Sequence, residues 1–196
     1  YLFNATVPRR ARGDVAFWAG AVDGTDPSLL WTEYHDYDEL PRLLDPSTGW
    51  LQNANDPPWT STLPSPLRRS DFPPYLSPSG MGARAQRSAH LLRADTSITF
   101  DELVAYKHDT RVEMADRVLD ELLPLAEASG DSLVQEAGRV LAAWDRRVDA
   151  DSRGAILFQE FMLNWTSPGS IATGWVNAPE WREPWSAEAP ASTPRG

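Results

Sequence analysis

The 196-residue chain contains no cysteine, which excludes disulfides and thiolate metal sites. It also lacks any run of about 20 apolar residues, the length that a membrane-spanning helix needs. Positive charge is in deficit, because 28 Asp and Glu outnumber 18 Lys and Arg and give a formal net charge of −10. This balance argues against nucleic acid or an anionic membrane as a partner.

A self-sufficient catalytic motif is also missing. The three His are far apart in the sequence, and neither a Gly-x-Ser-x-Gly motif nor a zinc signature is present. His35 stands near Asp36 and Asp38, but this spacing fits no strong ligand motif. We therefore expect a surface loop there and no metal site. His90 and His108 are expected on helix surfaces.

The most informative stretch that is present is segment 49–59, which reads GWLQNANDPPW. The Asp-Pro-Pro at its end forbids helix and favours extended backbone. Side chains two residues apart on an extended segment share a face, so Asn53 and Asn55 are expected to present their amides together. Such an amide can donate a hydrogen bond to a substrate carbonyl oxygen. The same residues also fit a turn in which Asn bonds its own backbone, and composition leaves both interpretations open.

The chain is expected to divide into three segments. Residues 1–80 form a strand and loop region that carries the Asn motif, 81–166 form a helical lobe, and 167–196 form an irregular tail rich in Trp and Pro. Exposed Trp at the density of this tail usually lies against another surface.

Within the first segment, residue types predict strands over 1–7 and 15–18. A long Pro-rich arm follows over 60–80, and loops of that length are either functional or disordered. Phe72 and Tyr75 predict that this arm is fixed onto the rest of the protein.

The helical lobe has clear local signals. A helix is predicted over 83–92, and Thr99 with Glu102 forms a capping box that begins another. Pro124 is expected to kink or divide the helix that contains it. The predicted helix over 155–165 is apolar on nearly all sides, which indicates burial on more than one face. We therefore expect a partner chain to cover part of it.

The Asn-Pro segment belongs to a longer series of landmarks in a fixed order. They are Val7-Pro8-Arg9-Arg10, Val22-Asp23-Gly24-Thr25, Trp31, Tyr37-Asp38-Glu39-Leu40-Pro41-Arg42-Leu43-Leu44-Asp45-Pro46, segment 49–59, Arg84-Ala85-Gln86-Arg87, Leu91-Leu92 and Trp144-Asp145. In this order, over residues 1–163, the sequence resembles the β-chain of penicillin-acylase-type N-terminal nucleophile hydrolases. It resembles in particular the aculeacin A and acyl-homoserine-lactone acylase branch.

The resemblance implies an α+β fold, in which this chain is a portion of an α-β-β-α sandwich. The portion would supply edge strands, the Pro-rich arm and the helical lobe, all within one larger hydrolase domain. In these hydrolases the nucleophile is the first residue of the mature β-chain, and its own α-amino group acts as base. Tyr1 cannot take that role. The nucleophile and one backbone N–H of the oxyanion hole are therefore expected outside this sequence.

The resemblance also assigns roles to single residues. Asn55 matches the Asn that donates a hydrogen bond to the oxyanion, and Arg84 matches the Arg that orients the site. Apart from the resemblance, Arg84 fits equally a residue at a helix start that pairs with Asp. Trp50, Asn53 and Trp59 are candidate substrate-binding residues.

The implied activity is hydrolysis of the amide bond of N-acyl compounds, with fatty-acyl amides such as acyl-homoserine lactones or lipopeptides as substrates. A β-lactam acylase is the alternative within this class, and a non-catalytic helical interaction module is the alternative outside it. The implied partners are the remaining α- and β-chain portions of the same precursor, and the implied location is periplasmic or secreted. Some relatives bind a structural calcium, but the loop after Arg12 lacks the expected Asp-Pro pattern. We therefore expect no metal and no cofactor.

Overall fold

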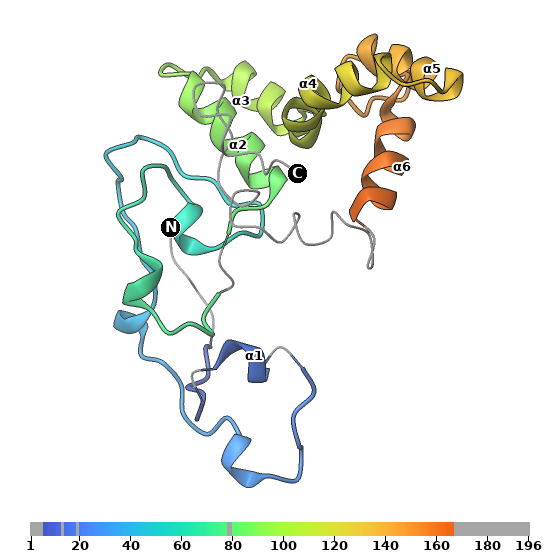
Figure 1. Ribbon diagram of the computed structural model, residues 1–196. Helices are drawn as coiled ribbons and strands as arrows, with labels where there is room; N and C mark the ends of the chain where they lie inside the picture. The colour runs from blue at the N-terminus through green and yellow to red at the C-terminus, as the bar shows by residue number, and fades with distance from the viewer. Residues whose placement is uncertain (1–5, 13, 19, 78–79, 167–196) are drawn as a thin grey trace. The chain divides into compact units, whose positions relative to one another are not determined.

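The computed structural model describes residues 6–12, 14–18, 20–77 and 80–166. The chain forms two compact units, Tyr1–Gly80 and Met81–Gly196, and Figure 1 shows the order of their elements along the chain. In the described part, every helix is too short or too polar to cross a membrane. The predicted tail over 167–196 and most of the predicted strand over 1–7 lie outside the described residues.

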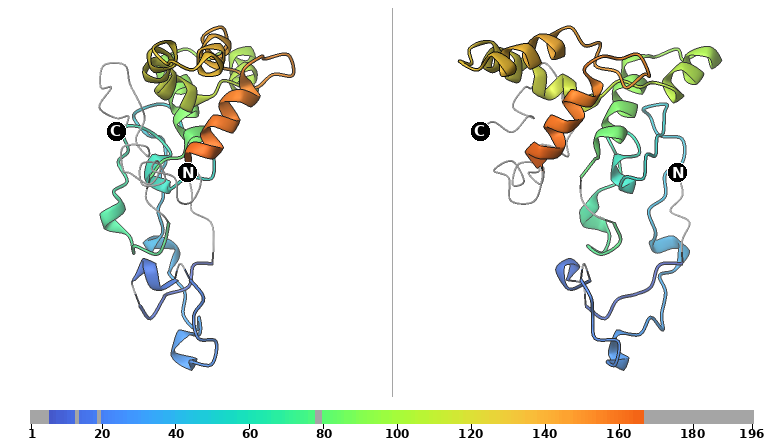
Figure 2. Two further views of the ribbon diagram at one scale, coloured as in Figure 1. Left: turned by 45° about the vertical axis from the view of Figure 1, so that its right-hand side comes forward. Right: turned by 90° about the vertical axis from the view of Figure 1, so that its right-hand side faces the viewer.

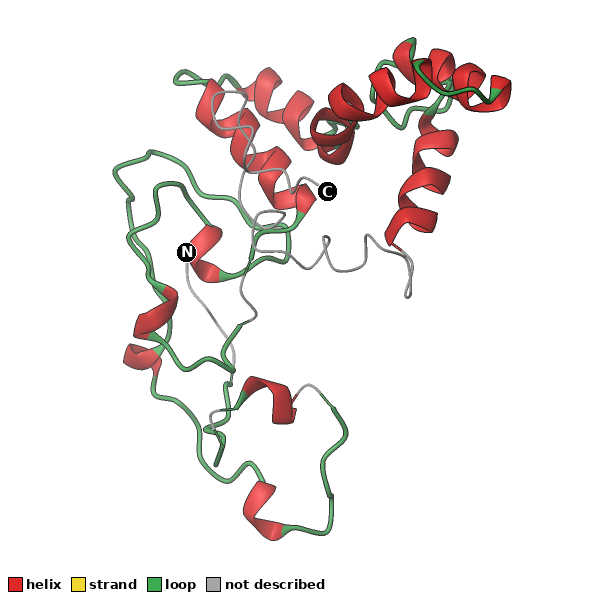
Figure 3. Cartoon of the chain, viewed as in Figure 1, coloured by secondary structure: helices red, strands yellow, loops and turns green. Residues whose placement is uncertain are grey.

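The first unit is built mainly from loops, as the green segments of Figure 3 show. Its regular elements are the short helix α1 (Val15–Trp18) and the 3₁₀ turns η1 (Pro27–Leu29), η2 (Tyr37–Glu39), η3 (Pro58–Thr60) and η4 (Arg69–Asp71). An antiparallel bridge joins Pro8 and Tyr34. On either side of it, the N–H of Arg9 donates to the carbonyl of Glu33 and the N–H of His35 to that of Val7. These bonds hold two segments far apart in sequence side by side.

The strand predicted over 15–18 is wrong, because these residues form α1. The carboxylate of Asp14 accepts the backbone N–H of Ala16 at 2.9 Å and that of Phe17 at 3.4 Å. An Asp in this position satisfies the amides that a helix start leaves without partners. This local cap outweighs the weak strand propensity of a four-residue segment in which three residues are aromatic or β-branched.

The Pro-rich arm is irregular, as predicted, and its aromatic residues fix it to the rest of the unit. The ring of Phe72 stacks on Trp59 with centroids 6.5 Å apart. The Tyr75 hydroxyl lies 2.8 Å from His35 Nε2. Both predicted anchors therefore contact residues outside the arm.

The second unit is helical. Its helices are α2 (Ala83–Ala94), α3 (Phe100–Lys107), α4 (Glu113–Glu127), α5 (Ser132–Ala142) and α6 (Ala155–Thr166). Helix α4 packs against both α2 and α5, and α6 packs against α5 (Figure 2). The buried core consists of Ala115, Val118, Leu119, Leu141, Trp144 and Phe158.

The predicted helix ranges are confirmed for α2 and α6, and of the two outcomes expected for Pro124, a kink or a division, the division is excluded. Helix α2 covers the predicted range, and the Thr99–Glu102 capping box is formed at the start of α3. Pro124 does not divide its helix, because α4 continues to Glu127. Pro124 stands in the last turn, where its missing N–H removes only one intrahelical bond and the helix is about to end.

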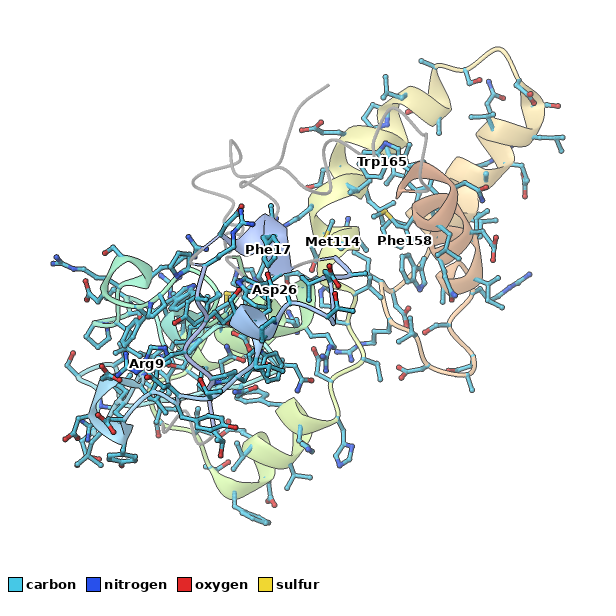
Figure 4. All side chains as sticks on the ribbon, turned by 90° about the horizontal axis from the view of Figure 1, so that it is seen from below. Arg9, Phe17, Asp26, Met114, Phe158 and Trp165 are labelled. Atoms are coloured by element: carbon cyan, nitrogen blue, oxygen red, sulfur yellow. The ribbon has the colours of Figure 1, made fainter. Side chains whose placement is uncertain are left out.

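Helix α6 combines one buried residue with an exposed apolar surface. Phe158 is 3% exposed and its ring lies 5.3 Å from that of Trp144. Further aromatic rings of α6 lead from Phe158 to Trp165 at the far end of the helix (Figure 4). Ile156 and Leu163 are 75% and 53% exposed. The expected partner chain would have this apolar surface to cover.

Ion pairs tie the loops of the second unit to α4. Asp116 accepts from Arg111 at 2.7 Å and from Arg146 at 2.9 Å. Burial alone would raise the pKa of the Asp116 carboxyl, but the bonds from the two guanidinium groups outweigh it and hold the pKa below its ordinary value. These pairs connect loops to α4 and do not contribute to the candidate site. The α-β-β-α sandwich stays a prediction.

Candidate functional site

The candidate site is the loop 49–62 of the first unit, which is closed at its base by backbone hydrogen bonds. Gly49 has a φ of 77°, in the left-handed region that glycine adopts without strain, and its N–H donates to the carbonyl of Pro46. The N–H of Gln52 donates to the carbonyl of Ser61 at 2.8 Å. The intervening residues therefore form a loop with a fixed start and a fixed end.

The carboxylate of Asp56 is the centre of this loop. It accepts the backbone N–H of Ala54 at 2.8 Å and the side-chain amide of Gln52 at 2.8 Å. It also accepts the hydroxyl of Thr60. Gln52 and Thr60 are each 8% exposed. The sequence analysis missed this network, although an Asp before two prolines, followed by Thr four residues later, is a turn signal that predicts side-chain capping.

Asn53 and Asn55 do not lie on one face of an extended segment, so that part of the prediction is wrong. Asn55 has a φ of 65°, which is the left-handed region, and the chain bends at this residue. Asn53 Oδ1 accepts the backbone N–H of Asn55 at 2.8 Å. The alternative interpretation, a turn in which Asn bonds its own backbone, is therefore confirmed for Asn53.

Asn55, the residue that matches the oxyanion Asn, is the one in the left-handed conformation. Asn tolerates this region better than most residues, yet it remains uncommon outside glycine. Conformations of this kind often occur at functional sites, where the surrounding structure holds them. Here the bonds from Asn53 and Asp56 do so, and the side chain of Asn55 is exposed. The loop can thus present an amide group from a fixed backbone.

The two tryptophans of the loop, Trp50 and Trp59, are partly buried. Trp59 stacks on Phe72, and the guanidinium of Arg69 lies 6.0 Å from the ring centroid of Trp59. Trp50 is half-buried near the start of the loop. Their predicted part in substrate binding stays a prediction.

Arg84 stands in the first turn of α2 and is exposed. It belongs to the second unit, whereas Asn55 belongs to the first. Each residue is placed within its own unit, and the orienting role of Arg84 stays a prediction.

A second polar cluster in the first unit surrounds His35, which was expected in a surface loop. Its side chain is only 6% exposed, with Nδ1 lying 3.2 Å from the carboxylate of Glu39 and Nε2 facing Tyr75. Glu39 also accepts from Arg9, and this bond lowers the pKa of Glu39 to about 2. The surface-loop prediction is wrong for this side chain, because partners 4 and 40 residues away bury it.

The expected surface positions of the other two His hold in part. His108 caps the end of α3 and is exposed. His90 is half-buried, with Nδ1 lying 3.1 Å from the carboxylate of Glu113. Among the residues that the structure describes, no group of three or more His, Asp or Glu is arranged to hold a metal ion.

A pocket with a volume of about 490 Å³ lies in the second unit, between α4 and α5. Its lining residues are Leu123, Glu127, Gln135, Gly138, Arg139 and Ala142. None of the predicted site residues is among them. The loop 49–62 therefore remains the better candidate for chemistry.

Comparison with known proteins agrees with the landmarks in the sequence. The chain matches the penicillin amidase family over residues 1–189. It belongs to that family.

A curated relative gives a more particular likeness. The chain is 26% identical over 200 residues to the penicillin acylase 2 proenzyme of Pseudomonas sp. (strain SE83). The match covers 100% of this chain and 24% of the relative. The chain thus spans about a quarter of the length of that proenzyme.

Proposed function

We propose that this chain is part of an acylase that hydrolyses the amide bond of N-acyl compounds, with Asn55 as a donor to the oxyanion. The observation that carries the proposal is the Asn-x-Asn loop of a penicillin amidase family member, in which Asn55 is held in a left-handed conformation. Arg84 is proposed to orient the same site. The nucleophile would come from another portion of the precursor.

The proposed amide hydrolysis requires little movement of the loop. Attack on an amide carbonyl places negative charge on its oxygen, and an amide N–H already aimed at that oxygen lowers the barrier. The bonds within the loop fix the backbone of Asn55 before substrate arrives. A donor of this kind is worth roughly 3–4 kcal/mol of barrier.

The substrate we propose is a fatty-acyl amide such as an acyl-homoserine lactone or a lipopeptide. Trp50 and Trp59 are partly buried and belong to the same loop as Asn55, on either side of it in the sequence, and we propose that they contribute apolar surface to the acyl site. A β-lactam acylase is the second candidate, and the name of the Pseudomonas relative favours it. We propose a periplasmic or secreted location for the enzyme.

The test is amine release by the complete processed enzyme from N-octanoyl-homoserine lactone and from penicillin G, assayed in parallel. We expect kcat/KM to be at least tenfold higher for the lactone. The reverse order would assign the enzyme to the β-lactam class. Absence of amine release from both compounds and from a lipopeptide would contradict the acylase and favour the interaction module.

A further inference from the structure

The guanidinium of Arg10 lies among three aromatic rings. Its central carbon is 5.0 Å from the ring centroid of Trp18, 5.4 Å from that of Tyr75 and 5.8 Å from that of Trp31. These residues come from α1, from the Pro-rich arm and from the stretch that follows η1. Segments that are far apart in sequence thus converge on one positive charge.

Among the described residues, Arg10 makes no hydrogen bond and no ion pair, and its Nε is buried without a partner. Acids that bond to the residues around Arg10 are engaged elsewhere. Asp14, four residues along the chain, caps α1 and lies 3.9 Å from Arg12, and Glu39 accepts from the neighbouring Arg9. The aromatic rings attract the cation, but they satisfy none of its N–H donors.

The chemistry of this arrangement selects the kind of group that would complete it. Because Nε is buried, the two terminal nitrogens of Arg10 are the donors that remain for a ligand. Two parallel N–H donors match the two oxygens of a carboxylate. A single guanidinium balances one negative charge, and a chain with a net charge of −10 disfavours a dianion such as phosphate.

We propose that Arg10, supported by Trp18, Trp31 and Tyr75, forms a binding site for a carboxylate group. None of these residues belongs to the loop 49–62 that carries Asn55, and the site does not depend on the proposed acylase activity. The carboxylate comes either from an acidic side chain elsewhere in the precursor or from a free small molecule.

The deciding experiment is a crystal structure of the complete processed enzyme, grown once in sodium acetate and once in sodium chloride. The proposal predicts carboxylate oxygens about 2.7–2.9 Å from both terminal nitrogens of Arg10. An Asp or Glu side chain in both crystals identifies the internal source, and acetate in one crystal identifies the free source. A guanidinium that contacts only water or backbone carbonyls in both crystals would overturn the proposal.

Melting temperatures in acetate and chloride of equal ionic strength test the site in solution. For the free source, acetate raises Tm in the wild type and not in Arg10→Met. For the internal source, acetate has no effect and Arg10→Met lowers Tm. Arg10→Lys then recovers only part of the lost Tm, because Lys lacks the planar fork of Arg. Acetate in the crystal without a Tm response means binding at crystal concentration only and contradicts the free source.

Arg42 offers a matched control. It lies 4.7 Å from the ring of Tyr37 and already pairs with Asp38 at 2.9 Å. Arg42→Met should therefore leave the acetate response at its wild-type value. An equal loss of the response in Arg42→Met and Arg10→Met would overturn the assignment to Arg10.

Discussion

The backbone N–H of Asn55 donates to Oδ1 of Asn53 across 2.8 Å, and this bond holds the left-handed turn that places Asn55. The two amides thus have different tasks. Asn53 serves the backbone of the loop, while the exposed amide of Asn55 is the group that we propose to serve the reaction.

Asn53→Ala should therefore reduce stability more than turnover. The lost bond resembles a lost cap, which costs about 0.5–2 kcal/mol. Thermal inactivation and kcat of the complete enzyme measure the two effects. Asn53→Asp retains an acceptor oxygen and is the control, so we expect it to stay near wild-type stability. A loss of kcat in Asn53→Ala that exceeds the loss in Asn55→Ala would reverse the two assignments.

Glu39→Gln should show a stability defect that depends on pH. The bond from Arg9 depresses the pKa of Glu39 from 4.5 to about 2. A depressed pKa means that the stabilisation is fully present above pH 4.5 and is lost as pH falls toward 2. Urea midpoints of wild type and variant should therefore differ at pH 7 and converge below pH 4.5. A constant difference over this range would show that the charge of Glu39 is not responsible.

Gly138→Ala should destabilise the contact between α4 and α5. A Cβ at this position would lie 2.8 Å from the Cβ of Ala126, which is closer than real contacts allow. Overpacking of this kind typically costs 1–3 kcal/mol, so Tm should fall by several degrees. Gly130→Ala is the control, because nothing lies within 4 Å of its added Cβ. Equal melting temperatures for the two variants would contradict the close packing of these helices.

Arg84→Ala should lower kcat of the complete enzyme at least tenfold while the precursor still matures. Arg84→Lys should recover only part of the activity, because Lys lacks the planar fork of Arg. Steady-state kinetics of the two variants provide the measurement. Wild-type turnover in Arg84→Ala would leave Arg84 as a residue of the helix start alone.

Local rules predicted the second unit better than the first. The capping box at Thr99 and the range of α2 depend on neighbours in sequence, and the structure confirms both. The burial of His35 depends on Tyr75, 40 residues away, and no local rule could reveal it. The same holds for Arg10, whose aromatic neighbours come from three separate segments.

At the candidate site the sequence predicted the residues but not their geometry. The Asp-Pro-Pro run indicated a loop, and no α-helix forms there, but the exclusion of all helix was too strict because Pro58 begins the 3₁₀ turn η3. The expectation that side chains two residues apart share a face was wrong, because it assumes extended backbone, whereas Asn55 has a positive φ. The network around Asp56 was missed, since a side chain that caps its own loop leaves no periodic pattern.

The most direct test of Asn55 as the oxyanion donor is single-turnover acylation by the complete processed enzyme carrying Asn55→Ala. A hydrogen bond made mainly in the transition state predicts that most of kcat is lost while KM changes little. Asn55→Asp should be at least as damaging, because a carboxylate repels the developing oxyanion. Acylation of Asn55→Ala at the wild-type rate would contradict the assignment of Asn55 as the oxyanion donor.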